Sequence, residues 1–474
     1  MQDKPDNFDA IVIGAGQAGP SLAAKLAASG QRVALVEAQH LGGTCVNFGC
    51  TPTKTLRKSA RVAHMARTAA QFGVHVGTVT VDFAAAMQRM QERVDASRHG
   101  LEWWVGSIPK LERITAWGQL AGKEGDQFLV HTESVSRAVR LLRAPRIFLN
   151  TGTRPFAPPI AGLQEVPHLN NESLLALREL PAHLVIIGGS YIGLELGQIF
   201  KRLGSEVSVI EAGPRITARE DADISAALAH MLIDEGVQLH TGRGIASVSR
   251  TAAGIEVQLS DGGRVGGSHL LMATGRAPNT DKLGLDSIGL ARDARGYIAT
   301  NERLETAVPG VWALGDINQR GAFTHTSYHD HEVVAHNQTA SAGAQMRTVS
   351  ERIPTYAMFT DPPLGHVGIY EADARLLVAQ GRRISQAVFA MKDVSRAKEE
   401  SETTGLIKLL VDEDSGLFLG ASILGMNADE IIQVIGQVMA AAGTWQTLRN
   451  ALPVHPTVTE FLPTILDKRK LMVL

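Results

Sequence analysis

The sequence has almost no charge imbalance, no long apolar run and only two cysteines. Its formal net charge is -2, and no block of one sign occurs, so neither nucleic acid nor a membrane surface is indicated as a partner. No segment approaches the roughly 18 consecutive apolar residues of a membrane-spanning helix. The start, MQDKPDNFD, lacks the charged and then apolar pattern of an export signal. We therefore expect a soluble, cytoplasmic protein.

The most informative pattern that is present is an internal repeat. Residues 8–38, FDAIVIGAGQAGPSLAAKLAASGQRVALVEA, return as residues 182–212, AHLVIIGGSYIGLELGQIFKRLGSEVSVIEA, without a gap. Each copy places an apolar strand before a glycine turn, a helix-period pattern after it, and then a second strand that ends on Glu37 or Glu211. This order is typical of units that bind dinucleotides. The sequence therefore predicts two dinucleotide sites.

The glycines of each copy have separate physical roles. The first permits a tight turn, the second lets the backbone approach a pyrophosphate, and the third lets helix and strand pack closely. The pyrophosphate then lies at a helix N-terminus, where backbone N–H groups favour negative charge. Glycines that serve packing alone are the alternative. The positions are Gly14, Gly16 and Gly19 in the first copy and Gly188, Ser190 and Gly193 in the second, where serine replaces the middle glycine.

The two cysteines lie close together in the segment LGGTCVNFGCTPTK. A regular helix would separate Cys45 and Cys50 by about 7.5 Å along its axis, whereas a disulfide requires Cα atoms within about 7 Å. The backbone between them must be distorted, and Gly49 supplies the freedom. A redox pair is the favoured interpretation. A metal site and inert core thiols are the alternatives, although no second cysteine pair could complete a four-ligand zinc site.

Several motifs together carry a family resemblance. They are GGTCVNFGC, the paired nucleotide units, ATGRAPN from Ala273, LGDIN from Leu314 and HPTVTE from His455. With them the chain resembles, over essentially its whole length, the class I pyridine nucleotide-disulfide oxidoreductases. This group contains dihydrolipoamide dehydrogenase, glutathione reductase and mercuric reductase. The resemblance implies a flavoprotein enzyme that passes electrons from a reduced nicotinamide through FAD to a disulfide of Cys45 and Cys50.

The resemblance also implies roles for individual residues. Cys45 would attack the substrate, Cys50 would be the thiolate that contacts the flavin, and Lys54 and Glu195 would form an ion pair beside it. The FAD site would contain Gly14, Gly16, Gly19, Glu37, Gly43, Thr44, Lys54, Gly152 and Asp316. The nicotinamide site would contain Gly188, Ser190, Gly193, Glu195, Glu211 and Gly275.

The C-terminal motif supplies the acid–base chemistry that thiol exchange requires. Exchange proceeds through thiolates, so each cycle moves protons on and off sulfur. Histidine titrates in the useful range, and a carboxylate that accepts a hydrogen bond from the ring fixes its tautomer. His455 and Glu460 match the family's pair, in which the histidine reaches the disulfide of the other subunit. The resemblance therefore implies a homodimer with shared active sites.

The coenzyme is predicted in more detail than the acceptor. Glu211 suits the free 2′-hydroxyl of NAD and repels the 2′-phosphate of NADP, so NADH is expected and NADPH is disfavoured, although Arg215 could soften the preference. The acceptor is predicted only as a small-molecule disulfide or another oxidised compound. Direct reduction of metal ions, quinones or oxidants is one alternative. A redox-sensing or structural subunit of a complex is an alternative of another class.

The predicted fold class is α/β, with two Rossmann-like dinucleotide-binding domains and a C-terminal α+β dimerisation domain. The FAD-binding domain is expected at residues 1–153 and 277–350, the NAD(P)-binding domain at 154–276, and the dimerisation domain at 351–474. Four histidines follow LGDIN, but ordinary surface or core positions are favoured over a metal site, so no metal is predicted. They are His325, His329, His331 and His336.

Overall fold

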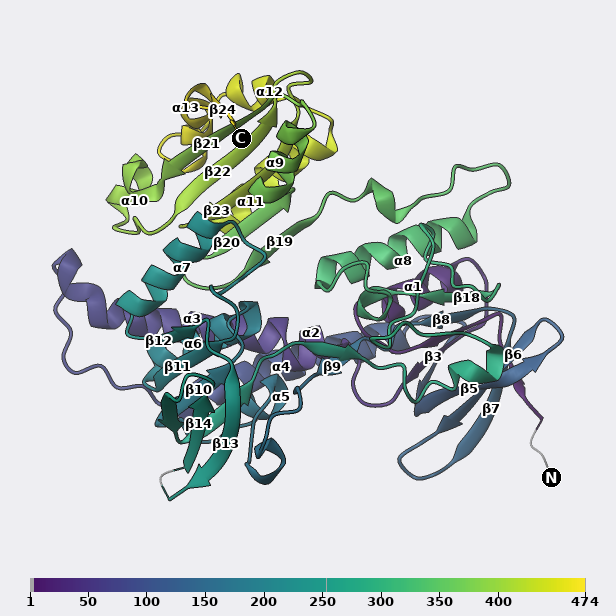
Figure 1. Cartoon of the computed structure of the whole chain (residues 1–474). Coiled ribbons are helices and arrows are strands. Elements are labelled where there is room, and N and C mark those ends of the chain that lie inside the picture. The colour runs from purple at the N-terminus through teal and green to yellow at the C-terminus, as the bar shows by residue number, and fades with distance from the viewer. Residues whose placement is uncertain (1–3, 253, 474) are drawn as a thin grey trace. The chain divides into compact units, whose positions relative to one another are not determined.

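The structure is a computed structural model that describes residues 4–252 and 254–473 of the chain (Figure 1). These residues divide into two compact units, each assembled from three segments. The first unit comprises the residues up to Thr55, residues 87–156 and residues 275–352. The second comprises residues 56–86, residues 157–274 and the residues from Ile353 onwards. The chain therefore leaves and re-enters each unit twice.

The first unit is built on a five-stranded parallel sheet. Its central strands read AIVI and VALVE and are buried along almost their whole length, as strands covered on both faces require. Side chains alternate between two cores, so that Val12 belongs to one core and Ile11 and Ile13 to the other. The sheet order is β18 (Val311–Ala313), β8 (Ile147–Leu149), β2 (Ala10–Ile13), β3 (Val33–Glu37) and β4 (Leu111–Thr115).

Helices cover one face of this sheet, and a second sheet covers the other (Figure 1). The helices that contribute apolar side chains are α1 (Gly19–Ala28), α8 (Thr324–Thr339) and the C-terminal part of α4 (Phe83–Gly106). The second sheet has the order β1 (Asp6–Asn7), β7 (Val139–Ala144), β6 (Gln127–Glu133) and β5 (Trp117–Glu124). A short antiparallel pair, β9 (Thr153–Pro155) and β17 (Arg276–Pro278), completes the unit.

The second unit contains another parallel sheet. It has four strands and packs its apolar residues against a three-stranded antiparallel sheet. The parallel strands are β12 (Gln238–Thr241), β11 (Glu206–Glu211), β10 (His183–Ile187) and β16 (His269–Met272). The antiparallel strands are β13 (Ile245–Thr251), β14 (Gly254–Leu259) and β15 (Arg264–Gly267). The associated helices are α5 (Asn171–Leu174), α6 (Tyr191–Leu203) and α7 (Ala222–Asp234).

The C-terminal segment of the second unit forms a six-stranded antiparallel sheet. A large apolar core joins this sheet to the helices α11 (Ala428–Ala440), α12 (Trp445–Arg449) and α13 (Leu462–Asp467). The strand order is β19 (Thr355–Met358), β20 (Leu364–Gly368), β23 (Phe418–Leu424), β22 (Leu406–Asp412), β21 (Ile384–Ala390) and β24 (Lys470–Leu471). The remaining helices are α9 (Glu371–Ala379) and α10 (Ser395–Glu399).

The internal repeat of the sequence is also a repeat of structure. In the first copy Ala10 pairs with Val33 in a parallel register, and in the second the equivalent residues Leu184 and Val207 pair in the same way. Each pair of strands encloses one helix, α1 or α6, that starts after the glycine turn. The two copies therefore have the same strand–turn–helix–strand geometry.

The predicted α/β class with two Rossmann-like halves and a C-terminal α+β segment is confirmed by this architecture. The boundaries of the three predicted domains stay a prediction. No helix in the described ranges is long and apolar enough to cross a membrane.

Candidate functional site

The two cysteines lie on either side of a helix break in the first unit. Cys45 belongs to α2 (Gly43–Phe48), and Cys50 is the first residue of α3 (Cys50–Thr68). Gly49 interrupts the helix between them, and a Cβ atom added there would lie 3.0 Å from the carbonyl oxygen of Thr44. A larger residue would therefore press on the backbone. The expected distortion between the cysteines is present, and the glycine occurs where it is required.

The side chains of Cys45 and Cys50 are half-buried thiols that hydrogen-bond to each other. That bond, burial and the charge of an ionised Cys50 raise the pKa of Cys45, while Thr324 and Lys54 oppose the shift. The pair can thus hold one negative charge much more easily than two. The sulfur of Cys50 also lies 3.2 Å from the hydroxyl oxygen of Thr324, the first residue of α8.

The first glycine turn is shaped by close backbone contacts. Gly14 has φ +100°, and a Cβ atom there would lie 2.3 Å from the carbonyl oxygen of Asn150. A Cβ atom on Gly19 would lie 2.1 Å from the carbonyl oxygen of Gly14. The amide of Asn150 binds the turn further, because its Oδ1 accepts from the Gly19 N–H at 2.9 Å and its Nδ2 donates to Leu314 at 3.0 Å. These positions accept glycine only.

The loop that carries the two cysteines packs directly on this glycine turn. A Cβ atom on Gly43, which has φ +55°, would lie 2.9 Å from the Cα atom of Gly16, and the Gly42 N–H donates to Ala15 at 2.8 Å. The carboxylate of Glu37 accepts from the Ala15 N–H at 2.7 Å with its other oxygen bound to the Gln39 N–H at 2.8 Å. The turn, the acidic residue and the start of α2 therefore form one local structure.

An arginine connects the loop that carries the two cysteines with the LGDIN motif. Arg276 donates to the Thr44 hydroxyl at 3.3 Å and to the Thr153 hydroxyl at 2.6 Å, and Thr153 donates to Asp316 at 3.2 Å. Burial raises the pKa of Asp316, and the charge of Arg276 lowers it in part. Thr44 and Asp316, which were predicted from separate motifs, are therefore joined by a continuous chain of hydrogen bonds.

The second glycine turn reproduces the first almost contact by contact. A Cβ atom on Gly188 would lie 2.3 Å from the Ala273 carbonyl oxygen, and one on Gly193 would lie 2.1 Å from the Gly188 carbonyl oxygen. Glu211 accepts from the Gly189 N–H at 2.8 Å and from the Gly213 N–H at 2.7 Å. These partners hold the positions of Ala15 and Gln39 in the first copy.

Two neighbours bear on the nucleotide preference of the second turn. Ser190, which replaces glycine, is exposed, and its side chain forms no capping hydrogen bond at the start of α6. Arg215 donates to the carbonyl oxygens of Ala218 and Glu220 at 3.1 Å each, so its guanidinium is held within its own loop. The carboxylate of Glu211 therefore dominates the charge at the end of β11.

Glu220, on the same loop, is a buried acid whose titration should make the stability of the protein depend on pH. Its side chain is 5% exposed, one oxygen binds the Tyr356 hydroxyl, and burial raises its pKa to about 7. The folded pKa lies above the unfolded value, so the stabilisation is complete below the unfolded pKa of about 4.5 and is lost as pH rises through 7. We expect a loss of up to about 3 kcal/mol between pH 5 and pH 8.

Thermal unfolding of wild type and Glu220→Gln at both pH values measures this effect. The stability of the variant relative to wild type should be higher at pH 8 than at pH 5. The surface variant Glu206→Gln is the control, because its side chain is 61% exposed. A difference between wild type and Glu220→Gln that is the same at both pH values would rule out this source of pH dependence.

Glu195 and Lys54 are found in different units. Glu195 is buried, and its carboxylate accepts a hydrogen bond from the Phe359 N–H at 2.7 Å. Lys54 lies one helical turn after Cys50 in α3, and its charge lowers the pKa of Cys45. Their predicted ion pair stays a prediction.

His455 and Glu460, which were predicted to act as an acid–base pair, contact each other. His455 Nδ1 lies 2.9 Å from a carboxylate oxygen of Glu460. The histidine side chain is 78% exposed, whereas that of Glu460 is only 16% exposed. Thr457 helps to fix the carboxylate, since its N–H donates to Glu460 at 3.4 Å and its hydroxyl accepts from the Glu460 N–H at 3.2 Å. The ring is thus oriented by an anchored acid and presented on the surface.

The four histidines after LGDIN have four different environments. His325 stacks on Phe323, His331 is buried against Tyr328, and His336 contacts the Gln345 carbonyl oxygen. His329 lies between Arg347 and Arg352, and burial together with their charges lowers its pKa. Their differing partners indicate packing and loop anchoring.

One acidic group among the described residues has the spacing of a metal site. It consists of Asp221, Asp223 and Glu371. The ammonium of buried Lys408 lies 3.1, 2.7 and 2.6 Å from these three carboxylates, respectively. The group is therefore a buried ion-pair cluster around a lysine.

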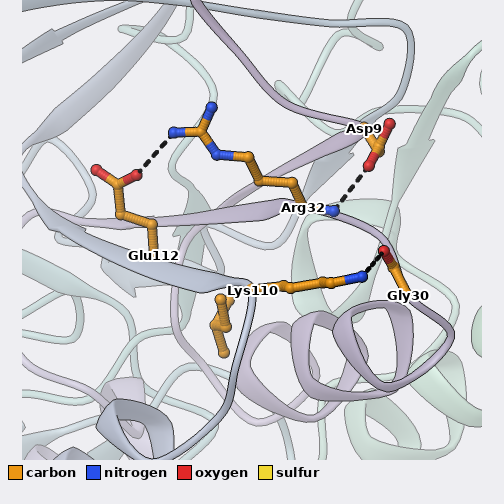
Figure 2. A pocket seen from close by; sticks show the side chains of 6 residues that line it. Asp9, Gly30, Arg32, Lys110 and Glu112 are labelled. Atoms are coloured by element: carbon orange, nitrogen blue, oxygen red, sulfur yellow. Dashed lines mark hydrogen bonds and ion pairs between the residues drawn. The ribbon is translucent and has the colours of Figure 1, made fainter.

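A surface pocket at the opposite edge of the first parallel sheet is not part of this site. It is lined by residues that precede β2, β3 and β4 or begin β4 (Figure 2). Its polar groups bind each other, because the Arg32 N–H donates to Asp9 at 2.7 Å and Lys110 donates to the Gly30 carbonyl oxygen at 2.8 Å (Figure 2). Ligands of open α/β sheets bind at the carboxyl ends of the strands, whereas this pocket lies at their amino ends.

The backbone around the first turn fits a dinucleotide. Gly152 has φ +64°, and a Cβ atom on it would meet no described heavy atom within 4 Å. This position therefore combines a backbone that favours glycine with open space beside it. Helix α1 starts at Gly19 and directs its N-terminus at the turn, which suits a pyrophosphate. These features fit FAD.

Three residues that complete this region were missed by the sequence analysis. Asn150 binds the glycine turn, Arg276 joins Thr44 to Thr153, and Thr324 contacts Cys50. Arg276 lies inside the motif ATGRAPN and Thr324 lies in the segment that follows LGDIN, but no spacing rule assigned them a contact. Asn150 follows β8 directly, and its place at a strand end was the only available signal.

The sequence matches known proteins over nearly its whole length. Residues 8–342 match the family described as pyridine nucleotide-disulphide oxidoreductase, and residues 354–465 match its dimerisation domain. The chain is 33% identical over 460 residues to the probable pyridine nucleotide-disulfide oxidoreductase RclA of Escherichia coli, covering 96% of this chain and 98% of that protein. It is 32% identical over 456 residues to a dihydrolipoyl dehydrogenase of Chlamydia muridarum, covering 96% and 95%.

A solved structure has the same fold. The Cu(II) complex of the HOCl-induced flavoprotein disulfide reductase RclA from Escherichia coli superposes with a TM-score of 0.86 at 31% sequence identity. The match covers 97% of this chain and 99% of that chain.

Proposed function

The chain belongs to the pyridine nucleotide-disulphide oxidoreductase family, and on this premise we propose that it uses NADH and FAD to reduce a disulfide of Cys45 and Cys50. The reduced pair of sulfurs then reduces an acceptor disulfide. One observation carries the proposal. The two thiols hydrogen-bond to each other across the Gly49 break, in the unit that contains the first glycine turn. Two sulfurs in contact can form and break a disulfide with little backbone movement.

The first glycine turn and its neighbours are the residues that would hold FAD. When bound, FAD accepts a hydride from the nicotinamide and releases two electrons to the disulfide. The glycine backbone and the start of α1 would receive the pyrophosphate, and Glu37 would accept from a ribose. We assign the FAD site to Gly14, Gly16, Gly19, Glu37, Gly43, Thr44, Lys54, Gly152 and Asp316. The nicotinamide site is assigned to Gly188, Ser190, Gly193, Glu195, Glu211 and Gly275.

The cysteines and the acid–base pair perform the exchange with the acceptor. Reduction breaks the sulfur–sulfur bond with two electrons and leaves two sulfurs that share one negative charge. Cys45 then attacks the acceptor disulfide, which forms a mixed disulfide and expels one thiolate. Cys50 attacks Cys45, restores the internal disulfide and expels the second thiolate. The overall change consumes one NADH, one proton and one disulfide and yields NAD⁺ and two thiols.

His455 is the residue that we assign to proton transfer in this cycle. It protonates each expelled thiolate and accepts a proton when an attacking thiolate forms, while Glu460 stabilises the protonated ring. The exposure of the ring supports a role in the active site of another chain. We therefore propose a homodimer in which His455 serves the cysteines of the partner subunit. A cytoplasmic location, where NADH is available, is part of the same proposal.

The acceptor is tested by NADH consumption with the purified holoenzyme. We expect turnover with a small disulfide such as lipoamide, and thioredoxin, quinones and mercuric and copper ions complete the set. Copper(II) is the second candidate acceptor, because a relative with the same fold is known as a Cu(II) complex. Turnover with copper or quinones but with none of the disulfides would reject the proposed acceptor class. Absence of bound flavin would reject the proposal as a whole.

The preference for NADH depends on Glu211. Replacing Glu211 by alanine removes a charge-assisted hydrogen bond to the ribose, which is worth roughly 1.5–3 kcal/mol, so kcat/KM for NADH should fall by about 10- to 150-fold. The value for NADPH should fall less than that for NADH, or rise. Glu206→Ala, at the exposed start of the same strand, is the matched control. Equal losses for NADH and NADPH would contradict the role of the carboxylate in discrimination.

A further inference from the structure

We propose that Asp261 is a specificity-determining residue, because its ion pair with Arg243 keeps that guanidinium from binding a phosphate on the adenosine ribose of the coenzyme. This inference rests on the proposed use of NADH and deepens it. It adds to Glu211 a second carboxylate that disfavours NADPH, on the turn between β14 and β15.

The chain that leaves β12 lies beside the place where the ribose is expected. Glu211, the last residue of β11, would accept from the ribose, and β12 is the neighbour of β11 on the side away from β10 (Figure 1). The Gly242 N–H donates to the Gly213 carbonyl oxygen at 2.7 Å. The Arg243 N–H donates to the Glu211 carbonyl oxygen at 3.3 Å. Arg243 therefore begins from backbone that contacts the segment assigned to the ribose.

Arg243 carries the kind of charge that suits a 2′-phosphate. A planar guanidinium can bind a phosphate with two parallel N–H bonds. The Arg243 side chain is 45% exposed, so a ligand can reach it. Burial and, after it, the charge of Arg243 lower the pKa of His240 on β12, which places this charge close to the sheet. A free Arg243 would therefore offset the repulsion between Glu211 and NADPH.

Asp261 holds this guanidinium at the turn between β14 and β15. One oxygen of its carboxylate lies 3.3 Å from Nε of Arg243. The other oxygen accepts from the Gly263 N–H at 3.0 Å, so the turn itself orients the carboxylate. The Ser260 N–H donates to the Gly244 carbonyl oxygen at 2.8 Å, which joins the turn to the residue after Arg243. Both partners of the ion pair are thus fixed by backbone contacts.

The ion pair acts differently on the two coenzymes. A guanidinium that is paired with a carboxylate must leave it to bind a phosphate, and the unpaired Asp261 would then repel that phosphate. NADH has a free 2′-hydroxyl and requires no cation at this position. An unfavourable contact with the wrong ligand is a common source of specificity. The pair therefore weakens the binding of NADPH and leaves that of NADH nearly unchanged.

The test measures how the purified holoenzyme binds two nucleotide fragments, by isothermal titration calorimetry. They are 2′,5′-ADP, which carries the 2′-phosphate, and 5′-AMP, which lacks it, and neither takes part in electron transfer. Asp261→Asn removes the charge but retains an oxygen that can accept from the Gly263 N–H. We expect the Kd for 2′,5′-ADP to fall by about 2- to 5-fold and that for 5′-AMP to change by less than about 1.5-fold. The kcat/KM for NADPH should rise by a similar factor.

Glu256→Gln is the matched control, because it removes one negative charge from the same antiparallel sheet, where Glu256 lies 3.7 Å from Arg264. Its Kd values should equal those of wild type. A double variant, Asp261→Asn with Arg243→Gln, should lose the gain in affinity, because no guanidinium is left to bind the phosphate. Arg243→Gln alone should bind 2′,5′-ADP no more tightly than wild type.

Three results would overturn the role of Asp261 and leave the proposed function intact. They are an unchanged Kd for 2′,5′-ADP in Asp261→Asn, an equal gain in Glu256→Gln, and a gain that persists in the double variant. A wild-type enzyme that binds neither fragment would overturn this inference together with the assigned nicotinamide site. A wild-type enzyme that binds the fragments but whose flavin is not reduced by NADH would instead reject the proposed function.

Discussion

Replacing Cys50 by serine will abolish two properties of the enzyme. One is the long-wavelength thiolate-to-flavin absorption band of the NADH-reduced enzyme, and the other is the reduction of disulfide acceptors. A serine oxygen cannot form the internal disulfide, so the route from the flavin to Cys45 is cut. We expect disulfide turnover to fall to about one thousandth of wild type or less, as for loss of a covalent catalyst. Anaerobic titration with NADH and steady-state assays with a disulfide measure the two effects.

The matched variant of this prediction is Cys45→Ser. It leaves the Cys50 sulfur without a disulfide partner, so the long-wavelength band should be present even before NADH is added. Disulfide turnover should be lost as severely as in Cys50→Ser, while reduction of quinones by NADH should persist in both variants. Retention of the band in Cys50→Ser would reverse the assignment of the two sulfurs.

Replacing His455 by alanine is expected to slow disulfide reduction by about 10²- to 10⁴-fold, the usual contribution of a positioned acid–base group. The loss should appear in kcat with disulfide acceptors, because the expelled thiolates lose their proton donor. Reduction of the enzyme by NADH, followed in a stopped-flow instrument, should keep its rate. The ring is 78% exposed, so folding should be unaffected.

Glu460 gives this prediction an internal control. Glu460→Gln retains a group that can accept from His455 Nδ1 but removes the charge that stabilises the protonated ring. Its loss of activity should therefore be smaller than that of His455→Ala. Full activity of His455→Ala would show that another group handles the protons.

The parts of the fold that the sequence predicted best are those with local or repeated signals. The repeat predicted two equal strand–turn–helix–strand units, and the structure gives them the same register and the same glycine contacts. The spacing of the cysteines predicted a break between them, because a regular helix cannot bring the two sulfurs together, and Gly49 marked where the backbone could break. Both predictions depended on spacing along the chain, which the sequence records directly.

The contacts that were missed join segments far apart in the sequence. Asn150 binds Gly19, Arg276 binds Thr44, and Thr324 binds Cys50, across separations of 131, 232 and 274 residues. No period or motif spacing encodes such pairs. Arg276 stood inside the quoted motif ATGRAPN, yet its glycine neighbour was chosen because glycine has a clear backbone role. The four histidines after LGDIN are the reverse case. They lie close together in the sequence, but the structure gives them unrelated packing partners.

The way Glu37 and Glu211 are held has a consequence for how the two nucleotides are recognised. Each carboxylate is already tied to two backbone amides, one in the turn and one two residues further along its own strand end. The acceptor is thus pre-organised, and a ribose that arrives does not have to restrict a mobile side chain. The same two hydrogen bonds also hold the glycine turn in place. A mutation of either glutamate should therefore make the turn less rigid and also remove a contact to the ribose, so one carboxyl group has both a structural and a recognition role.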